Sequence, residues 1–180
     1  MSYNSITELA GGKIFALHNT FPLDGRVSAY PLGARGHAAS NCYLLYEDDG
    51  ALLLDTGYAA HEDTILKQLS SIIDSKMPLS LFPLRMNEFM SVGNAMAIAK
   101  RFNVVECHSP VPDVACWLEF ETVGSDGKNK DIPTLATNLF DPSKKYWVGK
   151  IGNRPIAAFH APIRLISTRW IYDETTRTLF

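Results

Sequence analysis

The chain has 180 residues, of which 46% are hydrophobic and 20% charged, as is usual for a soluble globular protein. Its 17 basic and 19 acidic side chains give a formal net charge of −2, and no basic block is present. This near-neutral balance argues against nucleic acid as a partner. No apolar run approaches the roughly 18–20 residues that span a bilayer, which argues against membrane insertion.

The cysteines and the first residues bear on the cellular compartment. Cys42, Cys107 and Cys116 are an odd number with no CxxC pair, which favours free thiols in a reducing compartment. Residues 1–13 are polar and mixed, without the apolar core of a signal peptide. We therefore expect a cytoplasmic protein with one domain, residues 1–180.

Short apolar runs dominate the first third of the chain. Strands are predicted at residues 13–18, 26–32, 41–47 and 51–55. The last two form the strongest pair, because Asp49-Gly50 between them is a hairpin signal. The continuous apolar character of residues 52–54 predicts a strand that is buried on both faces.

Helical and strand patterns then alternate. Apolar residues at intervals of three and four predict helices at about residues 60–75 and 91–102. Further strands are predicted at residues 79–84, 103–107, 146–151, 154–161, 165–173 and 178–180. Residues 124–130 are the best candidate for a surface loop. This order indicates a layered α/β or α+β fold.

One hairpin carries a resemblance to a known family. Residues 40–57, SNCYLLYEDDGALLLDTG, resemble the opening hairpin of the metallo-β-lactamase superfamily, which ends in D-T-G. Asp55, Thr56 and Gly57 match that motif, and the family's Asp packs beneath the active site. Taken alone, the motif also fits an ordinary buried strand that ends in a turn.

Three later segments follow in the family's order. Residues 82–94 (FPLRMNEFMSVGN) stand where the family has T-H-x-H-x-D-H-x-G, and residues 161–173 (APIRLISTRWIYD) resemble its P-G-H-T-P-G-S with the strand that follows. Residues 175–180 resemble the tail that continues into a ligand Asp. The resemblance implies an αββα sandwich of metallo-β-lactamase type, incomplete at the C-terminus, with the flavodiiron-like branch as the nearest variant.

The residues at the family's metal positions depart from the pattern. Anchored on Gly93, the positions of His, His, Asp and His fall on Met86, Glu88, Met90 and Ser91. Glu88 alone suits a hard cation, and the diiron flavoprotein branch has Glu there, whereas thioether sulfur suits copper(I). The next ligand position falls on Arg164, whose guanidinium has no lone pair to donate. We therefore expect that the usual binuclear site is lost and that no cofactor is bound.

The same alignment defines a candidate pocket. Its residues are Asp55, Arg85, Glu88, Ser91, Asn94 and Arg164. The two guanidinium groups could bind a small anion, a carboxylate or a phosphate. Alternatively, they form a salt-bridge cluster with Asp55 and Glu88 that fills the space of the metals.

Two functions follow from this interpretation, and enzymatic activity is left open. The first is a degenerate, non-hydrolytic protein that binds a small anionic ligand or a protein partner. The alternative is a metal-dependent hydrolase or diiron oxidoreductase whose zinc or iron is held by Glu88 with His37, His108 or His160. A third expectation is self-association through an uncovered side of the sandwich, because the family's domain continues past the point where this chain stops.

Overall fold

The computed structural model describes residues 4–25, 30–85, 88–109, 137–139, 146–151, 154–161 and 168–180. They form a seven-stranded sheet with the order β1-β2-β5-β6-β7-β8-β9, a four-stranded sheet with the order β10-β11-β12-β13, and a small hairpin, β3-β4. The strands of the large sheet are β1 (Ser5–Leu9), β2 (Ile14–His18), β5 (Cys42–Glu47), β6 (Gly50–Leu54), β7 (Leu79–Phe82), β8 (Val104–Ser109) and β9 (Thr137–Leu139). The others are β3 (Thr20–Pro22), β4 (His37–Ala39), β10 (Tyr146–Ile151), β11 (Arg154–His160), β12 (Arg169–Asp173) and β13 (Thr178–Leu179).

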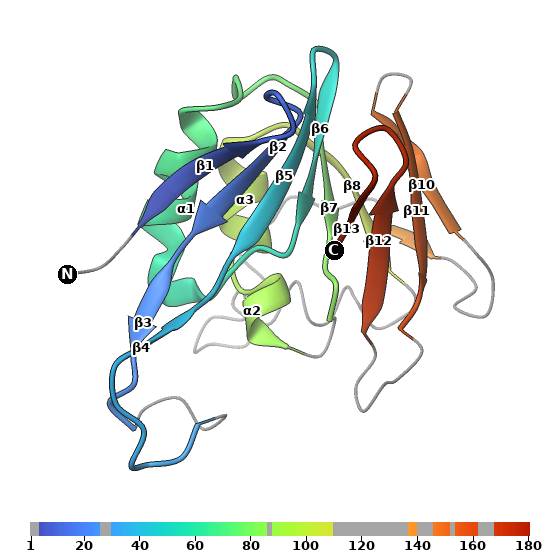
Figure 1. Cartoon of the computed structure of the whole chain (residues 1–180). Coiled ribbons are helices and arrows are strands. Elements are labelled where there is room, and N and C mark those ends of the chain that lie inside the picture. Colours follow the sequence, from blue (N-terminus) through green and yellow to red (C-terminus); the bar gives the residue numbers. More distant parts are fainter. Residues whose placement is uncertain are drawn as a thin grey trace, which may run out of the picture.

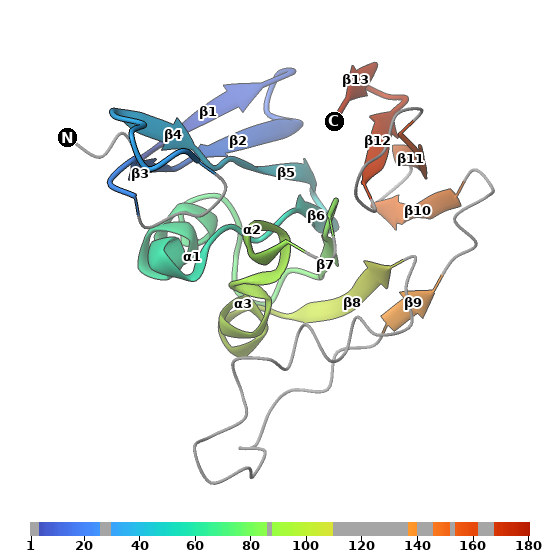
Figure 2. The same ribbon diagram turned by 90° about the horizontal axis from the view of Figure 1, so that it is seen from below.

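The described helices lie on one face of the large sheet, and the four-stranded sheet lies on the other (Figures 1 and 2). They are η1 (Ala59–His61), α1 (Glu62–Ser70), α2 (Phe89–Val92) and α3 (Ala95–Arg101). None of these helices in the described residues is long and apolar enough to cross a membrane.

Strand β6 takes part in two apolar cores, one on each of its faces. Leu53 packs with the helices in the first core, which includes Ile65 and Leu69 of α1. Leu52 and Leu54 face the four-stranded sheet in a second core, whose other buried members are Leu45, Phe82, Ile156, Ala158 and Ile171. The alternation of side chains along a strand explains the division, and the prediction of a doubly buried strand is confirmed.

The sheet topology determines where the site lies. Strands β1, β2, β5 and β6 pair antiparallel, whereas β6, β7, β8 and β9 pair parallel. Leu54 at the end of β6 pairs with Phe82 at the end of β7. The loops that follow these two strands therefore start side by side at the carboxyl ends of the strands. One loop contains Asp55 and the other contains Arg85.

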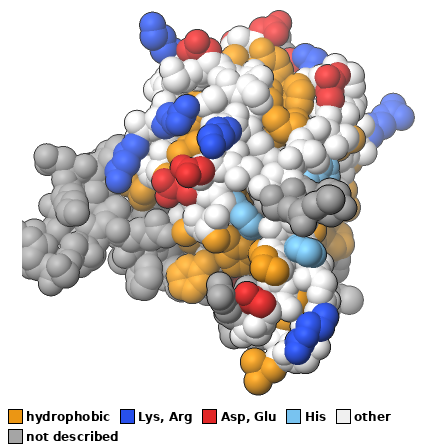
Figure 3. Space-filling model, turned by 90° about the vertical axis from the view of Figure 1, so that its left-hand side faces the viewer, with side chains coloured by type: hydrophobic (Ala, Val, Ile, Leu, Met, Phe, Trp, Pro, Cys, Tyr) orange, Lys and Arg blue, Asp and Glu red, His pale blue; other side chains and the backbone are white. Residues whose placement is uncertain are grey.

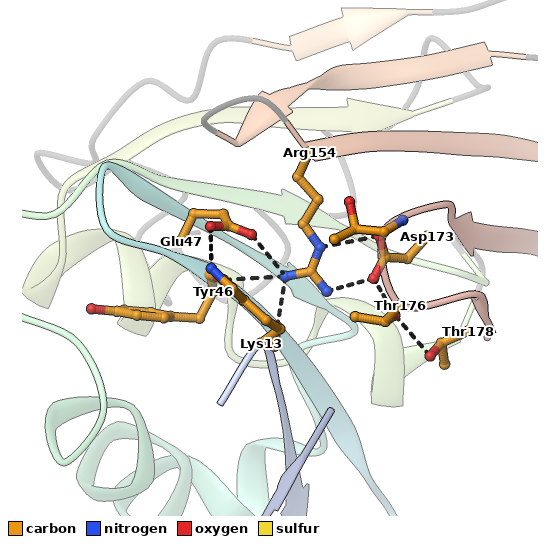
Figure 4. Close-up of polar contacts among 8 residues, drawn as sticks. Lys13, Tyr46, Glu47, Arg154, Asp173, Thr176 and Thr178 are labelled. Carbon is orange, nitrogen blue, oxygen red and sulfur yellow. Dashed lines mark hydrogen bonds and ion pairs between the residues drawn. The ribbon is translucent and has the colours of Figure 1, made fainter. Parts of the chain in front are cut away.

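A cluster of polar groups around the buried side chains of Arg154 and Asp173 joins the two sheets (Figure 4). Arg154 donates from Nε and Nη2 to both carboxylate oxygens of Asp173, at 3.1 and 2.5 Å. Its Nη1 donates to the backbone oxygens of Lys13, at 2.7 Å, and Tyr46, at 3.1 Å. The Glu47 carboxylate lies 3.6 Å from the same nitrogen. We call these five residues, together with Thr176, whose hydroxyl donates to Asp173, the Arg154 cluster.

Some expected elements are wrong. Residues 30–32 of the strand expected at 26–32 form no strand, and 26–29 lie outside the described residues. Pro31 lacks the amide hydrogen that a strand interior needs, and the pairing strands are β3 and β4 instead. The single helix expected at 91–102 is divided into α2 and α3, because the Asn94 amide donates to the Thr56 hydroxyl across the loop.

Candidate functional site

The Asp55 side chain lies under the loop that follows β7. Its backbone is left-handed, with φ of 60°, a conformation that Asp tolerates better than most residues. The carboxylate is 6% exposed and accepts the Leu84 amide at 2.7 Å and the Ser91 hydroxyl. The turn after β6 thereby aims a buried acid at the end of β7.

The rest of the D-T-G turn is fastened to α2 and α3. The Thr56 hydroxyl donates to the backbone oxygen of Ser91 at 3.1 Å, and the Asn94 side-chain amide donates to the backbone oxygens of Thr56 and Tyr58 at 2.8 and 2.9 Å. A Cβ on Gly93 would come within 2.8 Å of the Gly57 oxygen, so only glycine allows this approach. Asn94, which we expected in the pocket, thus uses its amide nitrogen to hold the turn.

Arg85 lies beside Asp55 and contacts two residues that align with ligand positions of the family. Its backbone amide donates to Ser91 Oγ at 3.2 Å, and its Nη2 donates to Met90 Sδ at 2.9 Å. Glu88 is half-buried just before α2. We call Asp55, Arg85, Glu88, Met90 and Ser91 the Asp55 cluster.

The environment of Asp55 makes its carboxyl harder to ionise than usual. Burial raises the pKa of the carboxyl to about 6, and the Ser91 hydroxyl, the Leu84 amide and the Arg85 charge oppose this rise only in part. The Glu88 charge adds to it. Burial, first of all, and the same Glu88 charge also raise the pKa of Tyr58.

The donors around Asp55 do not fit a binuclear metal site. Met90 Sδ and Ser91 Oγ are engaged by Arg85, and a thioether and a hydroxyl are poor zinc or ferric ligands. Within the ranges that the structure describes, no three His, Cys, Asp or Glu side chains could hold a metal ion. Met86 and Arg164 lie outside the described residues.

Of the histidines named for the alternative site, the two whose side chains the structure describes lie on different strands. His37 is exposed on β4. His108 is buried in β8, pairs through Nε2 with the Glu106 carboxylate at 3.1 Å, and stacks on Phe82 with ring centroids 5.9 Å apart. Burial lowers the pKa of His108, which keeps the ring neutral. The ring of His160 is outside the described side chains.

Neither cysteine that the structure describes resembles a nucleophile. Cys42 and Cys107 are free thiols and fully buried in the core under the helices. Burial raises the pKa of Cys42 far above its ordinary value and that of Cys107 to about 12. Both thiols therefore stay protonated and act as small apolar side chains. Cys116 lies outside the described residues.

A cavity of about 340 Å³ lies next to the D-T-G turn. It is lined by Phe21, Tyr58, Ala59, Ala60, His61, Phe89 and Gly93. Hydrophobic side chains also gather beside histidines on the lower part of the face seen in Figure 3. Sequence reasoning missed this cavity, since its residues come from β3, η1 and α2 and share no sequence motif.

Solved structures identify the architecture. The chain superposes with a TM-score of 0.69 and 15% identity on rubredoxin oxygen:oxidoreductase from Desulfovibrio gigas, covering 97% of this chain and 40% of that one. A variant of the flavo di-iron protein from Thermotoga maritima gives 0.68 at 16% identity, with the same two coverages. A metallo-β-lactamase from Pontibacter korlensis gives 0.62 at 16% identity, covering 98% of this chain and 70% of that one.

The protein therefore has the metallo-β-lactamase fold, as the D-T-G hairpin and the order of the later segments predicted. Its neighbours include flavodiiron proteins, the branch that Glu88 indicated, and the chain spans about 40% of the length of the first of these. No protein-family model matches the chain, and no curated protein does either.

Proposed function

We propose that this is a metallo-β-lactamase-fold protein without the usual binuclear metal site, which binds a small ligand or a protein partner and does not hydrolyse a substrate. The observation that carries the proposal is the hydrogen bonding of the Ser91 hydroxyl. Its hydroxyl stands at the position of a family histidine ligand, accepts the Arg85 amide and donates to Asp55.

The contacts of Arg85 support the same proposal. A guanidinium beside the former metal position supplies positive charge where the family has cations, and here it acts on the Asp55 carboxylate. Its bond to Met90 engages a second former ligand position. The cluster is thus internally hydrogen-bonded without a metal.

A small anion at Arg85 remains a second form of this binding proposal. The bond to Met90 uses one donor of the guanidinium and leaves others for an anion, but Asp55 and Glu88 both bring negative charge to the same place. An anion would have to compete with these carboxylates. The geometry therefore supports the salt-bridge cluster better than an anion site.

The alternative function is a metal-dependent hydrolase or a diiron oxidoreductase. Its support is the buried Asp55 carboxyl with a raised pKa beside Glu88, an arrangement that a bound cation would stabilise. The solved relatives add support, since one is named a flavo di-iron protein and another a metallo-β-lactamase.

Elemental analysis separates the two functions. The purified chain is measured as isolated and after incubation with zinc, iron(II) or manganese. We expect less than about a tenth of an equivalent of metal in each case, since metal affinity depends on a matching ligand set. One or two equivalents that are lost in Glu88→Ala, and kept in the matched surface variant Asp63→Ala, would overturn the proposal.

Self-association is proposed as well. Strand β1 is an edge of the large sheet among the described strands, all its residues are exposed, and it carries Ile6 and Leu9. Such an edge can pair with a second copy. Light scattering at micromolar concentration tests this: we expect a dimer or larger species, and a monomer would contradict the expectation.

A further inference from the structure

The cavity beside the D-T-G turn has aromatic walls that come from three elements. Its volume of about 340 Å³ is within the usual range of ligand pockets. Phe21 of β3, Tyr58 after β6 and Phe89 at the start of α2 all line it. The ring planes of Phe21 and Tyr58 stand at 82° with their centroids 5.3 Å apart, so the two rings form a corner. Phe89 is 56% exposed, so the lining reaches the surface of the protein.

The rings of this lining favour one kind of cation. Aromatic faces attract positive charge, and several rings around one hollow are a common receptor for quaternary ammonium groups. Such a group has no N–H, so it needs no hydrogen-bond acceptor from a lining of Phe, Tyr, Ala, His and Gly residues. A primary ammonium or a metal ion would lose its hydration there without replacement.

The charge beside the cavity has the sign that such a ligand needs. Glu88 immediately precedes the lining residue Phe89 and is half-buried, so water screens its charge less than that of a fully exposed acid. Burial first, and the Glu88 charge next, raise the pKa of Tyr58, and the opposing effect of Arg85 is the smallest of those acting on it. Above about pH 6, Asp55 and Glu88 carry two negative charges against the one positive charge of Arg85. This acidic side of the cavity disfavours an anion and favours a cation.

We propose that this cavity binds a small quaternary ammonium cation of the choline class, held by the rings of Phe21, Tyr58 and Phe89 and by the charge of Glu88. The inference rests on the proposed binding function, for which it names the ligand class. The occupant is a free small cation rather than a lipid headgroup, because the phosphate of a headgroup would be repelled by Glu88.

The first test is a ¹⁵N-NMR titration of the full chain at pH 8 with choline, 3,3-dimethylbutan-1-ol and phosphocholine. The alcohol has carbon in place of the choline nitrogen, so it keeps the shape without the charge, and phosphocholine adds the phosphate of a headgroup. We expect choline to bind about tenfold more tightly than the alcohol, the effect of a desolvated cation on aromatic rings, and phosphocholine to bind more weakly than choline. Shifted amides should include those of residues 58–61. Equal binding of choline and the alcohol, tighter binding of phosphocholine, or shifts confined to other elements would overturn the proposal.

Variants test the rings, the acid and the location separately. Phe89→Leu removes an exposed ring and keeps an apolar side chain, so the affinity for choline should fall about threefold while that for the alcohol stays the same. Glu88→Gln should lower the preference for choline over the alcohol by a similar factor. Its matched control is Glu8→Gln, an exposed acid on β1, which should keep the full preference. Ala60→Trp, at an exposed lining position, should fill the cavity and abolish binding of both probes while the spectrum stays folded.

The outcome can be told apart from that of elemental analysis on the same preparation. A preference for choline with shifts at residues 58–61 supports the inference whether or not metal is found. A protein free of metal that binds none of the probes overturns the inference and leaves the proposed loss of the metal site standing. Choline binding that is retained in Ala60→Trp, or a preference that is unchanged in Glu88→Gln, also overturns the inference.

Discussion

Two buried aspartates, Asp55 and Asp173, lie in different parts of the sandwich and differ in what surrounds them. Asp173 is fully buried but has Arg154 bonded to both of its oxygens, and these bonds with the Thr176 hydroxyl lower its pKa. Asp55 is held by one amide and one hydroxyl, and burial raises its pKa to about 6. Burial alone therefore does not determine the charge of a carboxyl, because a bidentate cation reverses the effect. Arg154 balances the charge of Asp173 within its cluster, whereas the negative charge of the Asp55 cluster is not fully neutralised.

The largest effect is expected on breaking the Arg154 cluster. Arg154→Ala leaves Asp173 buried without its cation, so the free energy of unfolding should fall by about 3–5 kcal/mol in chemical denaturation. The double variant Arg154→Met/Asp173→Leu removes both charges and should recover most of that loss. If the single variant lost less than about 1 kcal/mol, the contrast between the two aspartates would disappear.

The Asp55 carboxyl should make the free energy of unfolding fall as the pH rises. The folded pKa of Asp55, about 6, lies above its ordinary value of 3.8, so between these two pH values the folded state keeps a proton that the unfolded chain has lost. The contribution to stability is therefore present below pH 4 and lost as the pH rises through 6, in total roughly 3 kcal/mol. In Asp55→Asn this decline should be absent, and the variant should be the more stable protein at pH 8. Denaturation curves at pH 4, 6 and 8 measure both.

The Asp173 carboxyl predicts the reverse sign. Its pKa is lowered in the folded state, so its contribution is present above the unfolded value and is lost as the pH falls through the folded one. The free energy of unfolding of Asp55→Asn should therefore fall only on the acid side, as the pH drops through the folded pKa of Asp173. A profile that still declined from pH 4 to 6 would show that another group causes the decline.

A smaller effect is expected for Ser91→Ala. The Asp55 carboxylate would lose one donor and the Arg85 amide its acceptor, at a cost of about 1–3 kcal/mol. The pKa of Asp55 should rise further. Ser70→Ala, whose hydroxyl bonds only within α1, is the matched control and should change stability by a few tenths of a kcal/mol. Equal losses of stability in the two variants would mean that the bonds of the Ser91 hydroxyl have no special weight, and the proposed function would lose its main support.

The smallest effect is expected at the rim of the Arg154 cluster. Lys13 pairs with Glu47 at 2.5 Å, but its side chain is 41% exposed. Lys13→Ala should therefore cost less than about 1 kcal/mol, and the difference should shrink in high salt. A cost near that of Arg154→Ala would show that the rim and the buried pair act as one unit.

The sequence predicted the fold well where residue pattern and burial agree. Residues 41–47 nearly match β5, and residues 51–55 nearly match β6. Strand β1 was missed because all its residues are exposed, so no buried face imposes an apolar pattern on it. Its Ser-Ile-Thr-Glu-Leu sequence was the only available signal, an alternation of polar and apolar residues.

The candidate site was predictable only in part. The D-T-G motif led to Asp55, and the alignment of residues 82–94 with the family led to Arg85 and Ser91. The structure brings these three residues together. The roles of Met90 as an acceptor and of His61 as a cavity residue depend on the relative placement of distant elements, which one sequence does not encode in a local pattern. The pair of Arg154 and Asp173, 19 residues apart, is likewise defined by the register of β11 and β12.

The division of β6 between two cores has a consequence for synthesis of the chain on the ribosome. Leu52 and Leu54 emerge early, but Ile156 and Ile171, which cover them, come about a hundred residues later. At 5–20 residues per second this interval is on the order of 10 s. During that time one face of the nascent sheet is exposed to water, and the bond from Arg154 to the Lys13 backbone, which spans 141 positions, cannot yet form. We therefore expect the nascent chain to be most prone to aggregation before its second sheet has been made.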